Sequence, residues 1–292
     1  MANVLLTCRV VLLVCASLGM SGCTSMFFQP DKREVRNPAQ LDLAYRDVYV
    51  KTPDGLTLHG WWLAGDAPAV GTVVFFHGNA ENITTHIGSV YWLPKAHFNV
   101  LMMDYRGYGK SAGKTSLPGV LIDIDATLDY LLQESGLDSR NLIVFGQSLG
   151  GALAVYAVAH SPRKPRIRAL VIDSAFSGYQ AITREKMAGF WLTWPIQWLP
   201  ALTMPAEYDP VNSIGRVSPV PVLIVQGEDD QIVPSYHAQR LFDAASRPKE
   251  LWMVPGRGHI QVFNDTRQRE RLVTFMRRAI EDPAVLPQSP GD

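Results

Sequence analysis

The sequence predicts an α/β fold in which a mostly parallel central sheet is covered by helices on both faces. Short apolar runs alternate along the chain with segments whose apolar residues recur at helical spacing. Fully apolar runs are typical of strands that are buried on both faces of a sheet. Hydrophobic residues make up 47% of the 292 residues and charged residues 18%, so the chain can build a sizeable core.

The elements alternate from about Tyr45 onward. Residues 45–65 predict two strands joined by a turn at Pro53, Asp54 and Gly55. Six more strands are expected at residues 71–76, 98–104, 141–146, 168–173, 221–227 and 250–256. Three helices are expected at residues 120–135, 151–160 and 266–282.

Polar side chains stand where several of the predicted strands end. They are His77, Asp104, Ser148, Asp173, Asp230 and His259. In open α/β sheets, ligands bind beyond the carboxyl ends of the strands. Because packing alone does not explain this collection, the sequence predicts a functional site at that edge of the sheet.

Residues 179–218 interrupt the alternation between two predicted strands. This insertion contains Trp191, Trp194 and Trp198, and Pro195, Pro200 and Pro205 lie among and after them. A long insertion at this place predicts a lid over the site. The tryptophans either pack the lid onto the sheet or form an apolar pocket wall. The folded domain is expected over residues 45–281, followed by a proline-rich, disordered tail over residues 282–292.

Residues 1–22 predict a secretory signal, because Arg9 precedes an apolar run and then small residues. The apolar run is too short to span a membrane comfortably. The sequence Met-Ser-Gly-Cys that ends at Cys23 resembles a bacterial lipobox. This resemblance implies that Cys23 is lipidated and begins the mature chain, with a tether over residues 23–44. An uncleaved anchor helix and an ordinary cleaved signal are the alternatives.

The segment around Cys23 also predicts a location. Thr24, and not an aspartate, follows the cysteine. By resemblance to Gram-negative lipoproteins, this implies a lipid-anchored protein of the bacterial cell envelope, in the outer membrane and facing the periplasm. The 27 basic and 27 acidic residues give no net charge and no basic cluster, so nucleic acid is not an expected partner.

Ser148 lies in the motif Gly-Gln-Ser-Leu-Gly, between a predicted strand and a predicted helix. This is the context of a nucleophile elbow, a sharp turn that exposes the serine hydroxyl above the sheet. Gly146 and Gly150 have no side chains, so the strand and the helix can approach each other closely. The alternative is that Ser148 is merely a small polar residue in a tight corner.

A nucleophilic serine needs a base, and the base needs an acid that orients it. His259 follows the last predicted strand, and Glu228, Asp229 and Asp230 follow the preceding one. The order serine, acid, histidine is the one expected for a nucleophile elbow of this kind. The histidines elsewhere show no paired spacing that would predict a metal site, and the chemistry requires no cofactor.

The chain resembles the α/β-hydrolases from about residue 45 to residue 281. The matching motifs, in order, are HGNA (77–80), DYRGYGKS (104–111), GQSLGG (146–151), GEDDQIVP (227–234) and GRGH (256–259). The resemblance is to bacterial lipoprotein-type hydrolases and to eukaryotic members similar to acyl-protein thioesterases. It implies a serine hydrolase whose catalytic residues are Ser148, Asp230 and His259.

The same resemblance implies the remaining roles. Asp230 is preferred as the acid, and Asp173 is the alternative because some α/β-hydrolases place the acid there. The backbone N–H groups of Asn79 and Leu149 are implied as the oxyanion hole. His77 is expected to orient its loop, and the loop that contains Asp104 and Arg106 is expected to form a wall of the site through internal hydrogen bonds.

These residues together predict an enzyme that cleaves an ester or a thioester of an apolar acyl group. Two alternatives stay open at this point. One is a peptidase related to the aminopeptidases of the same fold. The other is a lipid-anchored envelope protein that keeps the fold without catalysis.

Overall fold

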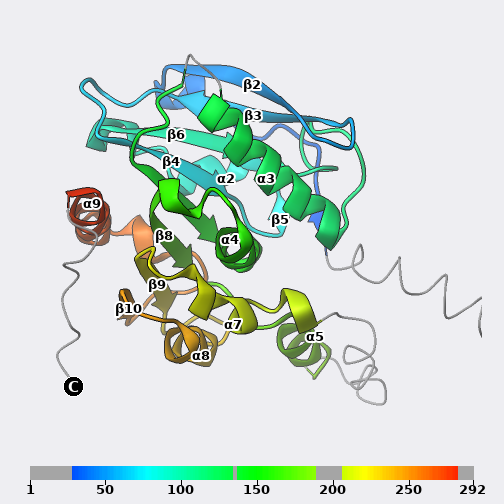
Figure 1. The fold of residues 1–292 in the computed structure, drawn as a ribbon, viewed down its shortest axis with the longest axis vertical. Coiled ribbons are helices and arrows are strands. Elements are labelled where there is room, and N and C mark those ends of the chain that lie inside the picture. Colours follow the sequence, from blue (N-terminus) through cyan, green and yellow to red (C-terminus); the bar gives the residue numbers. More distant parts are fainter. Residues whose placement is uncertain (1–27, 134–136, 189–205, 282–292) are drawn as a thin grey trace, which may run out of the picture.

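The structure, a computed structural model, describes residues 28–133, 137–188 and 206–281 (Figure 1). Eight strands form the central sheet. Their order is β10 (Lys249–Val254), β9 (Val222–Gly227), β8 (Ile167–Asp173), β7 (Leu142–Gln147), β4 (Gly71–Phe76), β6 (Phe98–Met103), β3 (Thr57–Leu63) and β2 (Tyr45–Lys51). The strands from β10 to β6 are parallel, and β3 and β2 add an antiparallel edge. The predicted mostly parallel sheet is therefore confirmed.

Strand β4 shows why the apolar runs are continuous. All six of its residues are buried. Val74 and Phe76 pack into the hydrophobic core on one face of the sheet, whereas Val73 and Phe75 pack into the core on the other. Since side chains alternate between the faces of a strand, a strand that is covered on both sides must be apolar at almost every position.

Helices cover the two faces of the sheet. The helices α3 (Leu117–Gln133), α4 (Leu149–His160) and α8 (Tyr236–Ala244) contribute to the larger core, and α3 and α4 lie in front of the strands in Figure 1. The helices α2 (Ile83–His86) and α9 (Thr266–Glu281) contribute to the smaller core on the opposite face. Helices α2 and α8 were not predicted from the sequence.

The insertion is described at both of its ends. It begins with α5 (Tyr179–Ala188) and ends with η7 (Ala206–Tyr208), α7 (Pro210–Ser213) and η8 (Ile214–Val217). Both α7 and η8 contact α4, and Ile214 and Val217 are buried in the larger core. The three tryptophans at positions 191, 194 and 198 lie outside the described residues, so a lid remains a prediction.

The N-terminal segment lies against the domain from Phe28 onward. Strand β1 (Gln29–Pro30) pairs in parallel with β5 (Ala80–Glu81), and η2 (Pro38–Leu41) precedes the main sheet. The part of the predicted tether that the structure describes is thus packed on the domain. Residues 1–27, which include Cys23, lie outside the described residues. No helix within the described ranges is long and apolar enough to cross a membrane.

Candidate active site

Ser148 lies at the junction between β7 and α4, with φ of 52° and ψ of −115°. A positive φ is uncommon for a residue that carries a side chain and usually indicates a functional constraint. Two backbone hydrogen bonds hold this conformation. The Ser148 N–H donates to the Asp173 carbonyl at 2.8 Å, and the Ser148 carbonyl accepts from Ala152 at 3.1 Å. The Ser148 side chain makes no capping hydrogen bond to α4, although it occupies the N-cap position.

Two glycines allow the sharp turn, as the motif predicted. A Cβ atom on Gly146 would lie 2.4 Å from the Gly150 carbonyl oxygen. A Cβ atom on Gly150 would lie 2.1 Å from the carbonyl oxygen of Phe76, at the end of β4. Both approaches are closer than any side chain allows. The first turn of α4 is therefore pressed against the ends of β7 and β4.

Asp230 and His259 form a hydrogen-bonded pair beyond the ends of β9 and β10. The His259 Nδ1 atom lies 2.7 Å from Asp230 Oδ2. The other carboxylate oxygen, Oδ1, accepts the N–H groups of Ile232 and Val233, both at 2.8 Å. The Asp230 side chain is fully buried, whereas that of His259 is 13% exposed. A carboxylate held in this way fixes the orientation and the tautomer of the imidazole.

Hydrogen bonds also keep Asp230 ionised. Burial alone would raise its pKa, but hydrogen bonds from His259 and from the backbone of Val233 and Ile232 outweigh burial. The pKa of Asp230 therefore lies below its ordinary value. A charged acid beside His259 is what a base that accepts a proton from serine requires.

The two alternative acids occupy other positions. Asp173 is completely buried, and its carboxylate accepts hydrogen bonds from Gln147 Nε2 at 2.9 Å and from the Ser174 hydroxyl at 3.1 Å. Asp229 is exposed, and its backbone N–H donates to the Arg257 carbonyl. Neither side chain takes the position of Asp230 against His259.

Short connections join the serine and histidine loops. The Ile260 N–H, next to His259, donates to the Ser174 hydroxyl at 3.0 Å. Asp173, the neighbour of Ser174, accepts the N–H of Ser148. The chain at Ser174 has a φ of 56°, which is again uncommon for a residue with a side chain. Ser174 thus links the end of β8 to both loops and was not identified from the sequence.

The predicted oxyanion donors come from two segments beside Ser148, the start of α4 and the loop after β4. Leu149 is the first residue of α4, where the N–H groups have no partner within the helix. Asn79 follows Gly78 in the loop after β4. A Cβ atom built on Gly78 would lie 3.6 Å from the Cβ atom of Ser148. The loop that contains Asn79 therefore passes directly beside the serine.

His77 and the first residues of the loop after β6 are buried. The His77 ring is buried, and its centroid lies 4.4 Å from the centroid of the Tyr105 ring. The His77 Nδ1 atom lies 2.8 Å from the Gly78 carbonyl oxygen. Asp104 accepts the Ile83 N–H, and Arg106 forms an ion pair with Asp123. These contacts are the kind of internal hydrogen bonds that were expected of both segments.

His86 is a residue of the site that sequence reasoning did not single out. A Cβ atom built on Gly78 would lie 3.1 Å from the His86 Cε1 atom, so His86 and Ser148 both lie close to Gly78. The His86 ring stacks on His77, and its Nε2 atom lies 3.0 Å from the Ala80 carbonyl oxygen. Loss of solvation, followed by the proximity of His77, lowers the pKa of His86 to about 3. The ring is therefore neutral at physiological pH, and no motif indicated its position.

Comparison with known proteins identifies the family. Residues 67–216 match the family model described as serine aminopeptidase, S33. The WAV2 protein of Arabidopsis thaliana, described as an α/β-hydrolase domain-containing protein, is 31% identical over 74% of this chain and 72% of its own length. The chain belongs to the α/β-hydrolases. The described residues of this α/β-hydrolase include no cluster of three His, Cys, Asp or Glu placed to hold a metal ion.

Other similar proteins extend the comparison across most of the α/β-hydrolase chain. The uncharacterized protein YfhR of Escherichia coli K12 is 32% identical over 92% of this chain and 93% of its own length. Among solved structures, the esterase Pf2001 of Pyrococcus furiosus is similar, with a TM-score of 0.69 and 26% identity. The alignment covers 86% of this chain and 98% of the esterase.

The first prediction concerns the acid of the site. Asp230→Asn keeps the shape of the side chain but removes the charge that orients His259. We expect kcat for a soluble p-nitrophenyl ester to fall by about 10⁴-fold, as for the equivalent change in a serine protease triad. Asp229→Asn, at the exposed neighbouring position, is the matched control and should keep the wild-type kcat. Retention of most of kcat in Asp230→Asn would contradict this assignment.

The second prediction concerns pH and stability. Burial raises the pKa of Asp173 from 3.8 to about 6, and the hydrogen bonds from Gln147 and Ser174 only partly oppose it. A raised pKa favours the folded state below the ordinary pKa, and this contribution is lost as pH rises through about 6.

Asp173→Asn removes this dependence. Relative to the wild type, its free energy of unfolding should be larger at pH 8 than at pH 4, by up to about 3 kcal/mol, so the variant gains stability as pH rises. Urea unfolding at the two pH values measures the difference, with Asp229→Asn as the control. An equal effect of Asp173→Asn at both pH values contradicts the prediction.

Proposed function

We propose that this α/β-hydrolase is a serine hydrolase that cleaves an acyl ester or thioester. Ser148 is the nucleophile, His259 the general base and Asp230 the acid that orients it. The observation that supports this most strongly is the 2.7 Å hydrogen bond from His259 to the buried Asp230, beyond the strand ends that also present Ser148. The similarity to a structure described as an esterase is a second support.

The first half of the reaction acylates the enzyme. His259 takes the proton of the Ser148 hydroxyl as its oxygen attacks the acyl carbonyl carbon. The N–H groups of Leu149 and Asn79 donate to the oxyanion of the tetrahedral intermediate. The intermediate collapses when His259 gives its proton to the leaving alcohol or thiol, which leaves the acyl group on Ser148.

The second half repeats these steps with water. His259 takes a proton from the water as it attacks the acyl carbonyl, and the same N–H groups stabilise the second oxyanion. Collapse releases the carboxylic acid and returns the proton to Ser148. Throughout both halves, the negative charge of Asp230 stabilises the imidazolium form of His259.

The substrate is proposed to carry an apolar acyl group, on the basis of the aromatic insertion in the sequence. Peptide hydrolysis is a second candidate, because the matching family model is described as a serine aminopeptidase. A non-catalytic envelope protein is the third, and it is disfavoured because the serine, acid and base are all present in their expected order.

The location is also a proposal. We propose that the protein is lipidated on Cys23 and anchored in the bacterial cell envelope, facing the periplasm. The lipobox-like sequence that ends at Cys23 supports this. Its partners are then the membrane and a small acyl substrate.

Ser148→Ala tests the proposed function. We expect the wild type to hydrolyse at least some members of a panel of p-nitrophenyl esters and acyl-thioesters of graded chain length, and Ser148→Ala to lose this activity. Aminoacyl-p-nitroanilides assayed in parallel test the peptidase alternative. Turnover of anilides but not of esters or thioesters would favour the peptidase, and no turnover by folded wild type would favour the non-catalytic protein.

Cys23→Ser tests the proposed anchor. The variant lacks the thiol that would carry the lipid, so we expect it to lose its membrane association after cell fractionation. The matched measurement is globomycin treatment of the wild type, which should cause the precursor to accumulate. If neither change occurs, the protein is attached by an anchor helix or is not attached at all.

A further inference from the structure

We propose that residues 28–36, which we call the strap, position the oxyanion loop formed by residues 77–82. The N-terminal segment is then part of the catalytic machinery and does more than connect the domain to an anchor. This proposal rests on the proposed function, because it assigns a positioning role within the same site.

The loop is fixed first at the peptide bond that contains the Asn79 N–H. The carbonyl of this peptide belongs to Gly78, and its oxygen accepts a hydrogen bond from His77 Nδ1 at 2.8 Å. Since a trans peptide is planar, fixing the carbonyl on one side also fixes the direction of the N–H on the other. Tyr105 adds a hydrogen bond from its hydroxyl to the His77 carbonyl at 3.0 Å.

The strap fixes Asn79 from the other side. The Gln29 N–H donates to Asn79 Oδ1 at 3.0 Å, and Gln29 pairs in parallel register with Ala80. The hydroxyl of Tyr108 donates to the Asn79 carbonyl at 2.6 Å and lies 3.1 Å from the same Oδ1 atom. Both oxygens of Asn79 therefore have donors, one of them from the strap, which leaves little freedom to rotate the residue.

The strap is itself well attached. Phe28 is 5% exposed and packs in the larger core. Asn82 donates through Nδ2 to the carbonyls of Asp31 and Arg33, both at 2.9 Å, and Gly109 donates its N–H to the Asp31 carbonyl at 2.9 Å. These bonds tie the strap to the end of the oxyanion loop and to the loop after β6.

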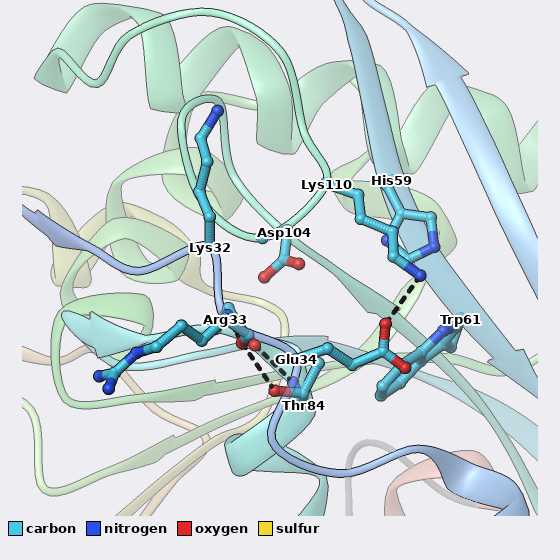
Figure 2. Close-up of a pocket in the computed structure, with 10 residues that line it drawn as sticks. Lys32, Arg33, Glu34, His59, Trp61, Thr84, Asp104 and Lys110 are labelled. Atoms are coloured by element: carbon cyan, nitrogen blue, oxygen red, sulfur yellow. Dashed lines mark hydrogen bonds and ion pairs between the residues drawn. The ribbon is translucent and has the colours of Figure 1, made fainter.

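Figure 2 shows the strap passing beside Thr84, with the Glu34 side chain reaching toward Lys110. The Val35 N–H donates to Thr84 Oγ1 at 3.0 Å, and Glu34 forms an ion pair with Lys110 at 3.0 Å. Glu34, Thr84 and Lys110 line a cavity with Asp104 that is only about 20 Å³ in volume, which leaves room for about one water molecule. These contacts hold the strap against α2 and the loop after β6.

Because the strap positions an oxyanion donor, a change in it should affect the stabilisation of the transition state more than the binding of substrate. The oxyanion forms only during the reaction, so a misplaced Asn79 N–H lowers kcat and leaves KM largely unchanged. Removing one oxyanion donor entirely costs about 10²–10³-fold in kcat. Loosening a donor that stays present should cost less, on the order of tenfold.

Gln29→Pro tests the strap, because proline removes the N–H that donates to Asn79 while the Gln29 side chain is exposed. With p-nitrophenyl butyrate and intact protein, we expect kcat to fall about tenfold. KM and the melting temperature should stay close to those of the wild type. Lys51→Ala, which changes an exposed side chain at the end of β2 and outside the strap, should keep the wild-type kcat and is the matched control.

A double-mutant cycle with Asn79→Leu separates positioning from general damage to the fold. Asn79→Leu removes the acceptor, so Gln29→Pro should have little further effect on kcat in that background. If Gln29→Pro leaves kcat unchanged, or if the two effects multiply, the strap proposal is overturned and the proposed function stands. Absence of hydrolysis by folded wild type overturns the proposed function instead, and this proposal with it.

Discussion

The backbone of Ser148 adopts a conformation that residues with side chains rarely take, and the surrounding elements are arranged to maintain it. Such a conformation costs on the order of 1–3 kcal/mol. The hydrogen bond to Asp173 at the end of β8, the start of α4 and the close approaches at Gly146 and Gly150 hold it in place. Without a covered parallel sheet, these three elements would not meet at one point, and the Ser148 hydroxyl would not stand above the strand ends.

Much of this arrangement could be predicted because it depends on local patterns. The bounds of β4 were predicted to the residue, since an apolar run broken by His77 and Gly78 has few other interpretations. The motif around Ser148 and the order of Asp230 and His259 are equally local, and the loops that follow β9 and β10 place the last two together. Helix α4 begins at Leu149, two residues before its predicted start, because Ser148 itself occupies the N-cap position.

The rest depends on contacts between segments that are far apart in the sequence. Nothing local to His86 indicates that its ring faces Gly78, and nothing in Gln29 or Tyr108 indicates that both donate to Asn79. The Gln29 contact arises where the N-terminal segment passes the loops that follow β4 and β6. It also brings the site close to the proposed anchor. Cys23 precedes Phe28 by five residues, which span at most about 18 Å when extended.

In the proposed site, Ser148, His259 and two backbone N–H groups all act on one acyl group. A crystal structure of the protein after reaction with a p-nitrophenyl phosphonate measures this directly. We expect phosphorus to be bonded to Ser148 Oγ, and the phosphonyl oxygen to lie about 2.7–3.1 Å from the backbone nitrogen atoms of Leu149 and Asn79. A phosphonate on another residue, or a phosphonyl oxygen directed away from both N–H groups, would contradict it.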